Sequence, residues 1–216
     1  MEVKHYNRNF VAEDICDLVG TRPFIIEIGS NDGKDTASFL EAMPEVYICC
    51  FEFDVRAIED FHARNLGPRV TLHEIGISDR TETRKSWLSG GIPDCNNPKK
   101  EWHKSNSIEE PREHKKKSPE ITFTKGPLIQ CHPLDYFWDE YQLPVDFLWC
   151  DCQGAEPEVI LGGQRTLRQT RYAIFEFYDA EVYARQADVR GLRSFLRDFE
   201  VMGIYGENVL FKNERL

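Results

Sequence analysis

The sequence predicts an α/β fold in which a doubly wound, mostly parallel sheet of seven strands ends in an antiparallel hairpin. Three observations predict it. Short apolar runs of strand length alternate with segments of helical periodicity, as in a parallel sheet covered on both faces. A glycine-flanked turn, Gly29 to Gly33, follows the first apolar run and opens a helical pattern. Two extended runs separated by Gly206-Glu207 close the chain, which is a hairpin signal.

The first half of the chain supplies repeated strand and helix units. Residues 9–20 carry apolar side chains at helical spacing and predict an opening helix. Strands are expected over Phe24–Ile28, Val46–Phe53 and Val70–Ile77, and helices over Lys34–Met43 and from Asp54 toward Asn65. Pro44 ends the first of these two helices, because proline has no backbone N–H to continue it, and Asp54 can cap the second.

The regular alternation stops between Ser78 and Lys117, where the sequence is polar and has little apolar periodicity. We expect a polar loop insertion at about residues 78–120, within a single domain that covers residues 1–216. We also expect it to close over the acceptor. A basic cluster in it can be interpreted as a solvated surface or as a site for an anionic substrate. The cluster contains Lys99, Lys100, Lys104, Arg112 and Lys115 to Lys117.

Alternation resumes after the insertion. The expected elements are short extended pieces at Glu120–Thr124 and Leu128–Cys131, a helix over Pro133–Tyr141, strands over Val145–Cys150 and Tyr172–Phe177, helices from Pro157 and from about Asp188, and the hairpin runs Glu200–Tyr205 and Asn208–Lys212. The last helix carries apolar residues at i, i+3, i+4 and i+7 and is therefore amphipathic.

Composition limits the partners of the chain. The 37 acidic and 27 basic residues give a net charge of −10, which argues against binding to a nucleic-acid backbone. No stretch has the length and apolar character of a membrane span or a signal peptide, so we expect a cytoplasmic protein without a membrane partner. The 7 cysteines lack the C-x-x-C spacing of a zinc knuckle and are expected to be structural thiols. The sequence leaves the oligomeric state open.

The turn from Gly29 to Gly33 indicates the kind of cofactor. A dinucleotide fingerprint, G-x-G-x-x-G, needs a second glycine so that the backbone can approach the diphosphate, and Asn31 occupies that position. Glu27 places an acid at the end of the strand, which suits a cofactor with positive charge. We therefore expect S-adenosylmethionine, with its sulfonium and ammonium groups, in preference to a nicotinamide dinucleotide.

Ligands of doubly wound sheets bind at the carboxyl ends of the strands, and several acids lie there in this sequence. Glu52 follows Gly29 by 23 residues, close to the ~20-residue interval at which an acid meets ribose hydroxyls; the alternative role is support of the following helix. The turn amides are expected to hold the methionine carboxylate. Phe53 and Ile77 are expected to contact the adenine or to pack in the core. The full expected cofactor set is Glu27, Gly29, Ser30, Asn31, Gly33, Glu52, Phe53, Ile77, Ser78 and Asp151.

Five segments resemble the FkbM family of methyltransferases: Glu27–Gly33, Cys50–Asp54, Ser105–Ser107, Pro133–Asp135 and Asp146–Glu156. They occur within a resemblance that spans Phe24 to Asn213. Two positions depart from the family pattern, since Phe53 stands where the family often has Pro and Gln153 where it often has Glu. The resemblance implies the Rossmann-like class I methyltransferase fold. It also implies methyl transfer from S-adenosylmethionine, commonly to an oxygen of a sugar or of a glycosylated or polyketide-type product.

A hydroxyl acceptor must lose a proton during methyl transfer, so we searched the strand ends for a general base. Asp151 is the first candidate, followed by Glu176 and His132, although each has a structural alternative such as capping a helix or bridging other groups. Ser105, Ser107 and Gln153 are expected to contact the acceptor, a small molecule or glycan. A divalent cation held by Asp151, Glu176 and Asp179 is possible but not favoured. The competing functions are a nicotinamide-dependent oxidoreductase and a non-catalytic nucleotide-binding module.

Overall fold

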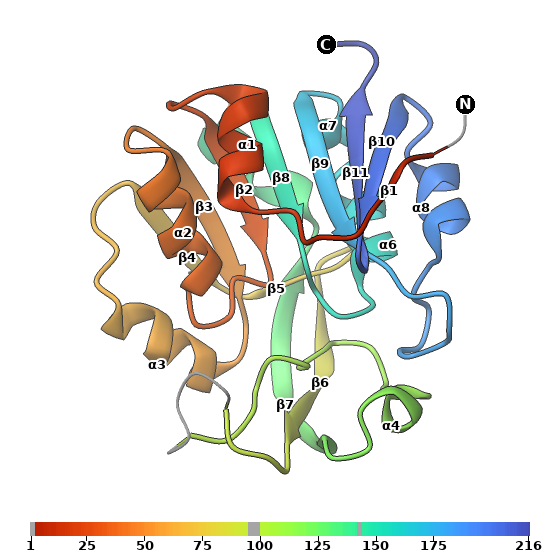
Figure 1. Ribbon diagram of the computed structural model, residues 1–216. Helices are drawn as coiled ribbons and strands as arrows, with labels where there is room; N and C mark the ends of the chain where they lie inside the picture. Colours follow the sequence, from red (N-terminus) through yellow and green to blue (C-terminus); the bar gives the residue numbers. More distant parts are fainter. Residues whose placement is uncertain (1–2, 95–99, 142–143) are drawn as a thin grey trace.

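A large sheet forms the centre of the molecule (Figure 1). The structure is a computed structural model that describes residues 3–94, 100–141 and 144–216. The strand order in the sheet is β1-β10-β11-β9-β8-β2-β3-β4. Its strands are β1 (His5–Tyr6), β2 (Phe24–Ile28), β3 (Tyr47–Glu52), β4 (Val70–Glu74), β8 (Val145–Cys150), β9 (Thr170–Glu176), β10 (Phe199–Tyr205) and β11 (Asn208–Asn213).

The pairing between strands follows the predicted pattern. Strand β2 pairs in parallel with β3 and β8, β3 pairs in parallel with β4, and β8 with β9. Strand β11 is antiparallel to both β9 and β10. The mostly parallel sheet with a C-terminal antiparallel hairpin is therefore confirmed. The short strand β1 adds an eighth member, parallel to β10 at the edge, and two residues are too few to show a periodicity in the sequence.

Helices cover both faces of this sheet. On one face lie α1 (Ala12–Val19), α2 (Lys34–Ala42) and α3 (Val55–Ala63); the other carries η1 (Leu134–Phe137), α5 (Trp138–Tyr141), α6 (Glu156–Gly162), α7 (Gln164–Leu167) and α8 (Val189–Phe195). Neighbouring residues of a strand point to opposite faces. Ile25 accordingly packs in one core cluster with Ile15 and Phe39, whereas Ile26 belongs to a second cluster with Val159.

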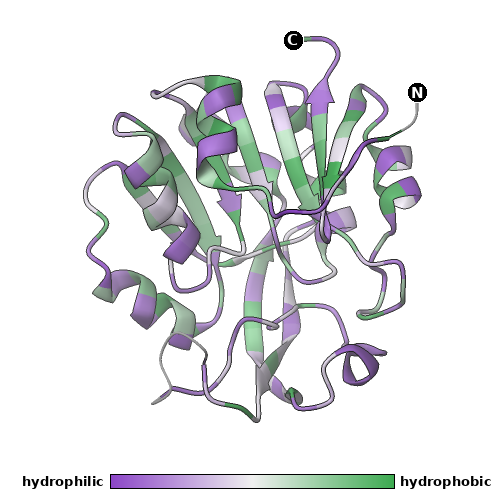
Figure 2. Cartoon of the chain, in the orientation of Figure 1, coloured by the Kyte–Doolittle hydropathy of each residue, from purple (hydrophilic) through white to green (hydrophobic). Residues whose placement is uncertain are grey.

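Residues 76–132, called the insert below, lie at the carboxyl ends of the central strands (Figure 1). The insert contains β5 (Gly76–Ile77), β6 (Glu82–Gly90), α4 (His114–Lys117) and β7 (Thr122–His132). These strands form a separate sheet of order β5-β7-β6, in which β6 and β7 are antiparallel. Figure 2 shows α4 and the connecting segments of the insert as mostly hydrophilic, in contrast to the strands of the large sheet.

Two expectations about this region need correction. The polar loop predicted at 78–120 is wrong for residues 82–90, which form β6. Strand β6 is held by its antiparallel partner β7, and its polar sequence lacks the apolar alternation by which strands are recognised. The strand predicted over Val70–Ile77 is divided, because β4 ends at Glu74 and β5 belongs to the smaller sheet.

Helix length and thiol chemistry give two further results. None of the helices in the described part of the chain combines the length and apolar character needed to cross a bilayer. None of the 6 cysteines in the described part forms a disulfide. Cys49, Cys50, Cys131 and Cys150 are buried among apolar side chains, as expected of structural thiols.

Candidate functional site

A cavity opens at the carboxyl ends of β2, β3 and β8, against the insert. It has about 1000 Å³ of empty space, including the part open to solvent. Seven residues of the expected cofactor set line it: Gly29, Ser30, Asn31, Glu52, Phe53, Ile77 and Asp151. The structure therefore brings most of the set to one place, although the ends of four strands, β2, β3, β5 and β8, supply it.

The turn after β2 requires glycine at its first position. Gly29 has a φ of +83°, and a Cβ atom built there would lie 1.8 Å from the backbone carbonyl oxygen of Asp151. Any side chain at this position would force the end of β8 away from β2. Asn31 has a φ of +47°, a left-handed conformation that asparagine adopts more readily than most residues.

The backbone amides of this turn do not have the role expected from the sequence. The N–H groups of Gly29 and Ser30 donate to the carbonyl of Phe51 at 3.0 and 3.1 Å. The N–H of Asn31 donates to the Glu52 carboxylate at 3.0 Å. Since these donors are used within the protein, they are not available to a cofactor carboxylate. The ammonium group of Lys34, which also lines the cavity, is the better candidate for that contact.

Glu52 connects two turns at the cavity wall. One carboxylate oxygen accepts from the Asn31 amide, and the other accepts from the amides of Phe53 and Asp54 at 2.7 and 2.8 Å. Three bonds leave a carboxylate with further acceptor capacity, so a ribose hydroxyl can still donate to it. Burial raises the pKa of Glu52 to about 7, and the three amide bonds oppose that rise.

Asp151 and Glu176 form a carboxyl pair beside the cavity, in which Glu176 is buried and Asp151 is half-buried. The Nε2 group of Gln153 donates to both, at 2.8 Å to Asp151 and 2.7 Å to Glu176. Burial raises the pKa of Asp151, and burial followed by the Asp151 charge raises the pKa of Glu176. Two interacting carboxyl groups titrate as a pair, and the larger rise at Glu176 favours a proton on that group.

Gln153 holds this pair in place. Its Oε1 atom accepts from the hydroxyl of Tyr183 at 3.0 Å, and its Nε2 atom serves the two carboxyl groups. Its backbone has a φ of +55°, and its carbonyl accepts from Ser107 Oγ at 2.7 Å. The sequence suggested Gln153 as an acceptor contact. Gln153 lines the cavity, and its side-chain amide is also engaged within the protein, where it orients the carboxyl pair.

Two residues of the expected cofactor set lie behind the cavity wall. The carboxyl group of Glu27 is buried and accepts from Thr36 Oγ1 at 2.6 Å. Burial, with a smaller effect of the Asp35 charge, raises the pKa of Glu27 to about 8. Gly33 has a φ of +74°, and its amide donates to the Ser30 carbonyl at 2.9 Å. Both residues shape the turn and the start of α2 and do not line the cavity.

His132 and Ser78 are also outside the cavity lining. The His132 ring stacks on Tyr136 with 4.3 Å between centroids, and its Nδ1 atom lies 2.9 Å from Thr81 Oγ1. Ser78 is fully buried, and its hydroxyl donates to the Arg80 carbonyl at 2.7 Å. Neither residue is placed for the role expected of it, as a general base for His132 and as a cofactor contact for Ser78.

Ser105 and Ser107 connect the insert to the site and are not in the cavity lining. Ser105 Oγ accepts from the Trp102 indole at 3.0 Å, and its carbonyl accepts from Tyr183 at 3.0 Å. Ser107 donates to the carbonyl of Gln153. Both serines are buried. They therefore support the site from behind, whereas the sequence suggested contact with the acceptor.

The insert supplies cavity residues that the sequence did not reveal. His103 and Asn106 line the cavity although their segment has no periodic pattern. Within the described residues, the buried atoms Asn31 Oδ1 and His103 Nδ1 lack a hydrogen-bond partner. Burial lowers the pKa of His103, which favours a neutral ring that can accept a hydrogen bond. Both atoms are enclosed in the cavity wall and have almost no surface exposed to the cavity.

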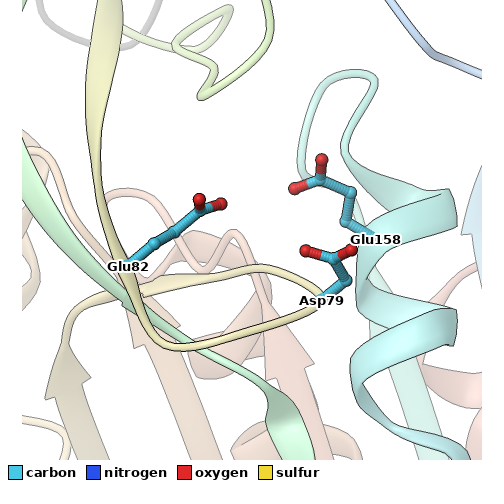
Figure 3. Close-up of side chains that lie close together, drawn as sticks. All are labelled: Asp79, Glu82 and Glu158. Atoms are coloured by element: carbon cyan, nitrogen blue, oxygen red, sulfur yellow. The ribbon is translucent and has the colours of Figure 1, made fainter.

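Of the three carboxyl groups that the sequence suggested for a cation, the structure brings Asp151 and Glu176 together but does not group Asp179 with them within the described residues. Figure 3 shows another set, in which oxygen atoms of Asp79, Glu82 and Glu158 all lie within 4.8 Å of one another. Arg84 and Arg185 form ion pairs with Glu158, and Arg84 lies 3.8 Å from Glu82. These guanidinium groups already compensate the cluster, which weakens the case for a metal ion there.

The basic cluster of the insert is largely paired with acids of the same chain. The ion pairs are Lys100–Asp60, Lys104–Asp94, Arg112–Glu181, Lys116–Glu113 and Lys117–Glu207. Lys99 lies outside the described residues. These pairs favour a structural role for the cluster over recognition of an anionic substrate.

Comparison with known proteins gives one family and one curated relative. The model of the methyltransferase FkbM domain matches residues 27–201. A 2-O-methyltransferase, NoeI, from Sinorhizobium fredii (strain NBRC 101917 / NGR234) is 37% identical over 203 residues, which are 90% of this chain and 81% of that protein.

Solved structures give more distant likenesses. An rRNA methylase from Streptococcus thermophilus is 12% identical, with a TM-score of 0.49 over 94% of this chain and 93% of that one. Aeropyrum pernix fibrillarin in complex with S-adenosyl-L-methionine is 14% identical, with a TM-score of 0.48 over 90% and 68%. Likeness at this level adds nothing to the fold assignment, which rests on the strand order and pairing given above.

Proposed function

This chain belongs to the FkbM methyltransferase family and is a methyltransferase, and we propose that it methylates a hydroxyl oxygen of a sugar or of a glycosylated or secondary-metabolite molecule. The family implies S-adenosylmethionine as the methyl donor. The relative NoeI is a 2-O-methyltransferase, which supports oxygen as the acceptor atom. A nicotinamide-dependent oxidoreductase and a non-catalytic nucleotide-binding module are not favoured.

One observation carries the proposal: acidic and apolar side chains that suit a nucleoside with positive charge line one cavity at the strand ends. Glu52 has remaining acceptor capacity for a ribose hydroxyl, and Asp151 lines the same cavity. Phe53 and Ile77 offer apolar contacts for a base. These residues would hold S-adenosylmethionine, which supplies an electrophilic methyl group when it is bound.

The carboxyl pair of Asp151 and Glu176 supplies the base in this proposal. Asp151 lines the cavity, and Glu176 adjoins it through Gln153. An ionised Asp151 carboxylate can accept the proton of an acceptor hydroxyl, and its raised pKa makes it a stronger base than an exposed carboxylate. The protein otherwise has to align the acceptor with the donor.

The proposal also includes the class of acceptor, the cellular compartment and the domain organisation. The net charge of −10 favours a small-molecule acceptor over a nucleic acid. The absence of disulfides among the 6 described cysteines suits a reducing compartment such as the cytoplasm. We also treat residues 1–216 as one domain, since the insert and the large sheet line the same cavity.

The proposal is tested with labelled donor. Purified protein is incubated with S-adenosylmethionine that carries a tritiated methyl group and with a fractionated cell extract, and the labelled product is identified by mass spectrometry. We expect a methyl ether on a small polar molecule. Label on a nitrogen or carbon atom would contradict the acceptor chemistry. Absence of any transfer, with S-adenosylhomocysteine still bound, would favour a binding module.

A further inference from the structure

A second cleft lies beside the cofactor cavity, and we call it the outer cleft. It has about 1580 Å³ of empty space, including the part open to solvent. It is lined by residues 9–13, by α2, by the ends of β8 and β9 and by the β10–β11 turn. In Figure 1 the segment before α1 crosses in front of β8 and β9, at the edge where this cleft lies.

The outer cleft adjoins the cofactor cavity at two places. Lys34 and Asp35 line both spaces. Glu176 lines the outer cleft, whereas its partner Asp151 lines the cavity, and Gln153 joins them through its two hydrogen bonds. A molecule in the outer cleft therefore reaches Glu176 where the two spaces adjoin, next to the carboxyl pair.

Most of the charged side chains that line the outer cleft are acidic. Its lining contains the carboxyl side chains of Glu13, Asp35, Glu41, Glu176 and Glu207, against the single basic side chain of Lys34. Glu207 is paired with Lys117 at 2.5 Å. The raised pKa of Glu176 favours its neutral form. The negative charge of the cleft therefore rests on Glu13, Asp35 and Glu41, which repel an anionic group and attract a cationic one.

Aromatic rings form the apolar part of the lining. Trp149 lies with its ring centroid 5.4 Å from Phe39 and 6.4 Å from Phe10. Phe10 and Phe39 are buried in the core behind the cleft, and Trp149 is the partly exposed ring of the three. Asn9 and Asn208 add their amides to the lining. Carboxylates and amides bind hydroxyl groups, and the face of Trp149 can pack against C–H groups. The lining thus suits a polar molecule with several hydroxyl groups.

We propose that the outer cleft is the acceptor site, and that it takes an uncharged or cationic polyhydroxylated acceptor and rejects an anionic one. The inference rests on the proposed function and places the acceptor outside the insert, where the sequence suggested that it would be held. The insert covers the cofactor cavity, while α1, α2 and the hairpin turn select the acceptor.

Matched acceptors test the charge preference. The probes are 4-nitrophenyl glycosides of neutral hexoses, of the corresponding amino sugars and of the corresponding uronic acids, each assayed with tritiated donor. We expect transfer to neutral or amino members at a rate at least about tenfold above the uronic acids, a preference of about 1.4 kcal/mol. Equal or faster transfer to uronic acids would overturn the proposal.

Two tryptophan substitutions test the location. Ser38 is exposed in α2, lines the outer cleft and does not line the cofactor cavity. Ser38→Trp should fill the cleft and lower transfer to every accepted glycoside at least about tenfold, with the affinity for S-adenosylhomocysteine unchanged. Ser194→Trp is the control. Like Ser38, Ser194 is an exposed helical serine whose hydroxyl donates to a preceding backbone carbonyl, but it lies in α8 and does not line the outer cleft. Wild-type transfer by Ser38→Trp would overturn the proposal.

A charge variant tests the mechanism of selection. The test is a double variant that carries Glu13→Gln and Glu41→Gln, and it should reduce the preference for neutral over uronic acceptors several-fold. The control is a double variant that carries Glu45→Gln and Glu59→Gln. It removes the same charge from exposed positions elsewhere and should leave the preference unchanged. An unchanged preference in the first variant would contradict selection by these carboxylates. If no glycoside is methylated while S-adenosylhomocysteine binds, the acceptor class is wrong; if S-adenosylhomocysteine does not bind, the proposed function fails.

Discussion

Four buried carboxyl groups near the cavity and one in the insert show two kinds of compensation. Asp54 and Asp32 at the strand ends are paired with Arg56 and Arg64. In the insert, Glu109 is likewise paired with Arg84 at 2.8 Å and with Arg185 at 2.9 Å. Glu27 and Glu52 at the strand ends are equally buried, but hydroxyl and amide groups are their partners in place of a guanidinium group. The pKa values of these two groups are raised to about 8 and about 7.

The difference separates structural from functional acids. A guanidinium group keeps its partner carboxylate ionised and fixes the position of the chain segments that carry the two groups. Such ion pairs can order a polar insert that has little apolar core. A carboxyl group without a cation remains available to a positively charged ligand or to a proton. Among the acids without a cation, we therefore read Glu52, which lines the cavity, as part of the chemical site, whereas Glu27 lies behind the cavity wall.

The largest effect is expected from removal of Arg84. Arg84→Met leaves Glu109 and Glu158 buried with less compensation, and it should lower the free energy of unfolding by about 3–5 kcal/mol. Urea denaturation measures the change, and Arg197→Met at an exposed position serves as the control. A loss below about 1 kcal/mol, the level of a surface pair, would show that the network does not hold the insert.

Substitution at the carboxyl pair should affect catalysis and leave the fold intact. Asp151→Asn should reduce the rate of methyl transfer by at least about 100-fold, because a general base is lost. Initial rates with the acceptor found by labelling measure it. Asp179→Asn is the matched control at an exposed position, and it should retain wild-type activity. A large loss in the control would instead revive the cation set that includes Asp179.

A smaller effect is expected from Glu27 and depends on pH. Its pKa in the folded state is about 8, above the ordinary value of 4.5, so the folded protein binds its proton more tightly than the unfolded chain. The resulting stabilisation is complete below pH 4.5 and is lost as the pH rises toward 8, with a slope of at most about 1.4 kcal/mol per pH unit.

Glu27→Gln should therefore gain stability relative to the wild type as the pH rises from 5 to 8. Urea midpoints at several pH values measure the difference, and Glu45→Gln at an exposed position is the control. A constant difference between Glu27→Gln and the wild type would contradict a proton held by Glu27 in the folded state.

Much of the sheet could be predicted because its strands are apolar runs bounded by turn residues. Gly29 was recognisable for the same reason, since a glycine after a buried strand signals a tight turn. Glu52 and Asp151 were found because the carboxyl ends of parallel strands meet at one edge. These signals are local, and the fold makes them converge.

The rest of the site depends on contacts between distant segments. His103 reaches the cavity from an irregular segment, and β6 depends on pairing with β7, so neither leaves a periodic trace. Glu27 was expected at the cavity because it is an acid in the first strand, but its side chain points to Thr36 of α2. Strand periodicity shows that a side chain is buried and does not show what it meets.

The central claim is that the cavity above β2, β3 and β8 binds the nucleoside of the methyl donor. A crystal structure with S-adenosylhomocysteine tests it most directly. We predict the nucleoside in that cavity, with its ribose at Glu52 and its base against Phe53 and Ile77. A ligand bound at another place, or crystals that take up none of it from a saturating solution, would contradict the account.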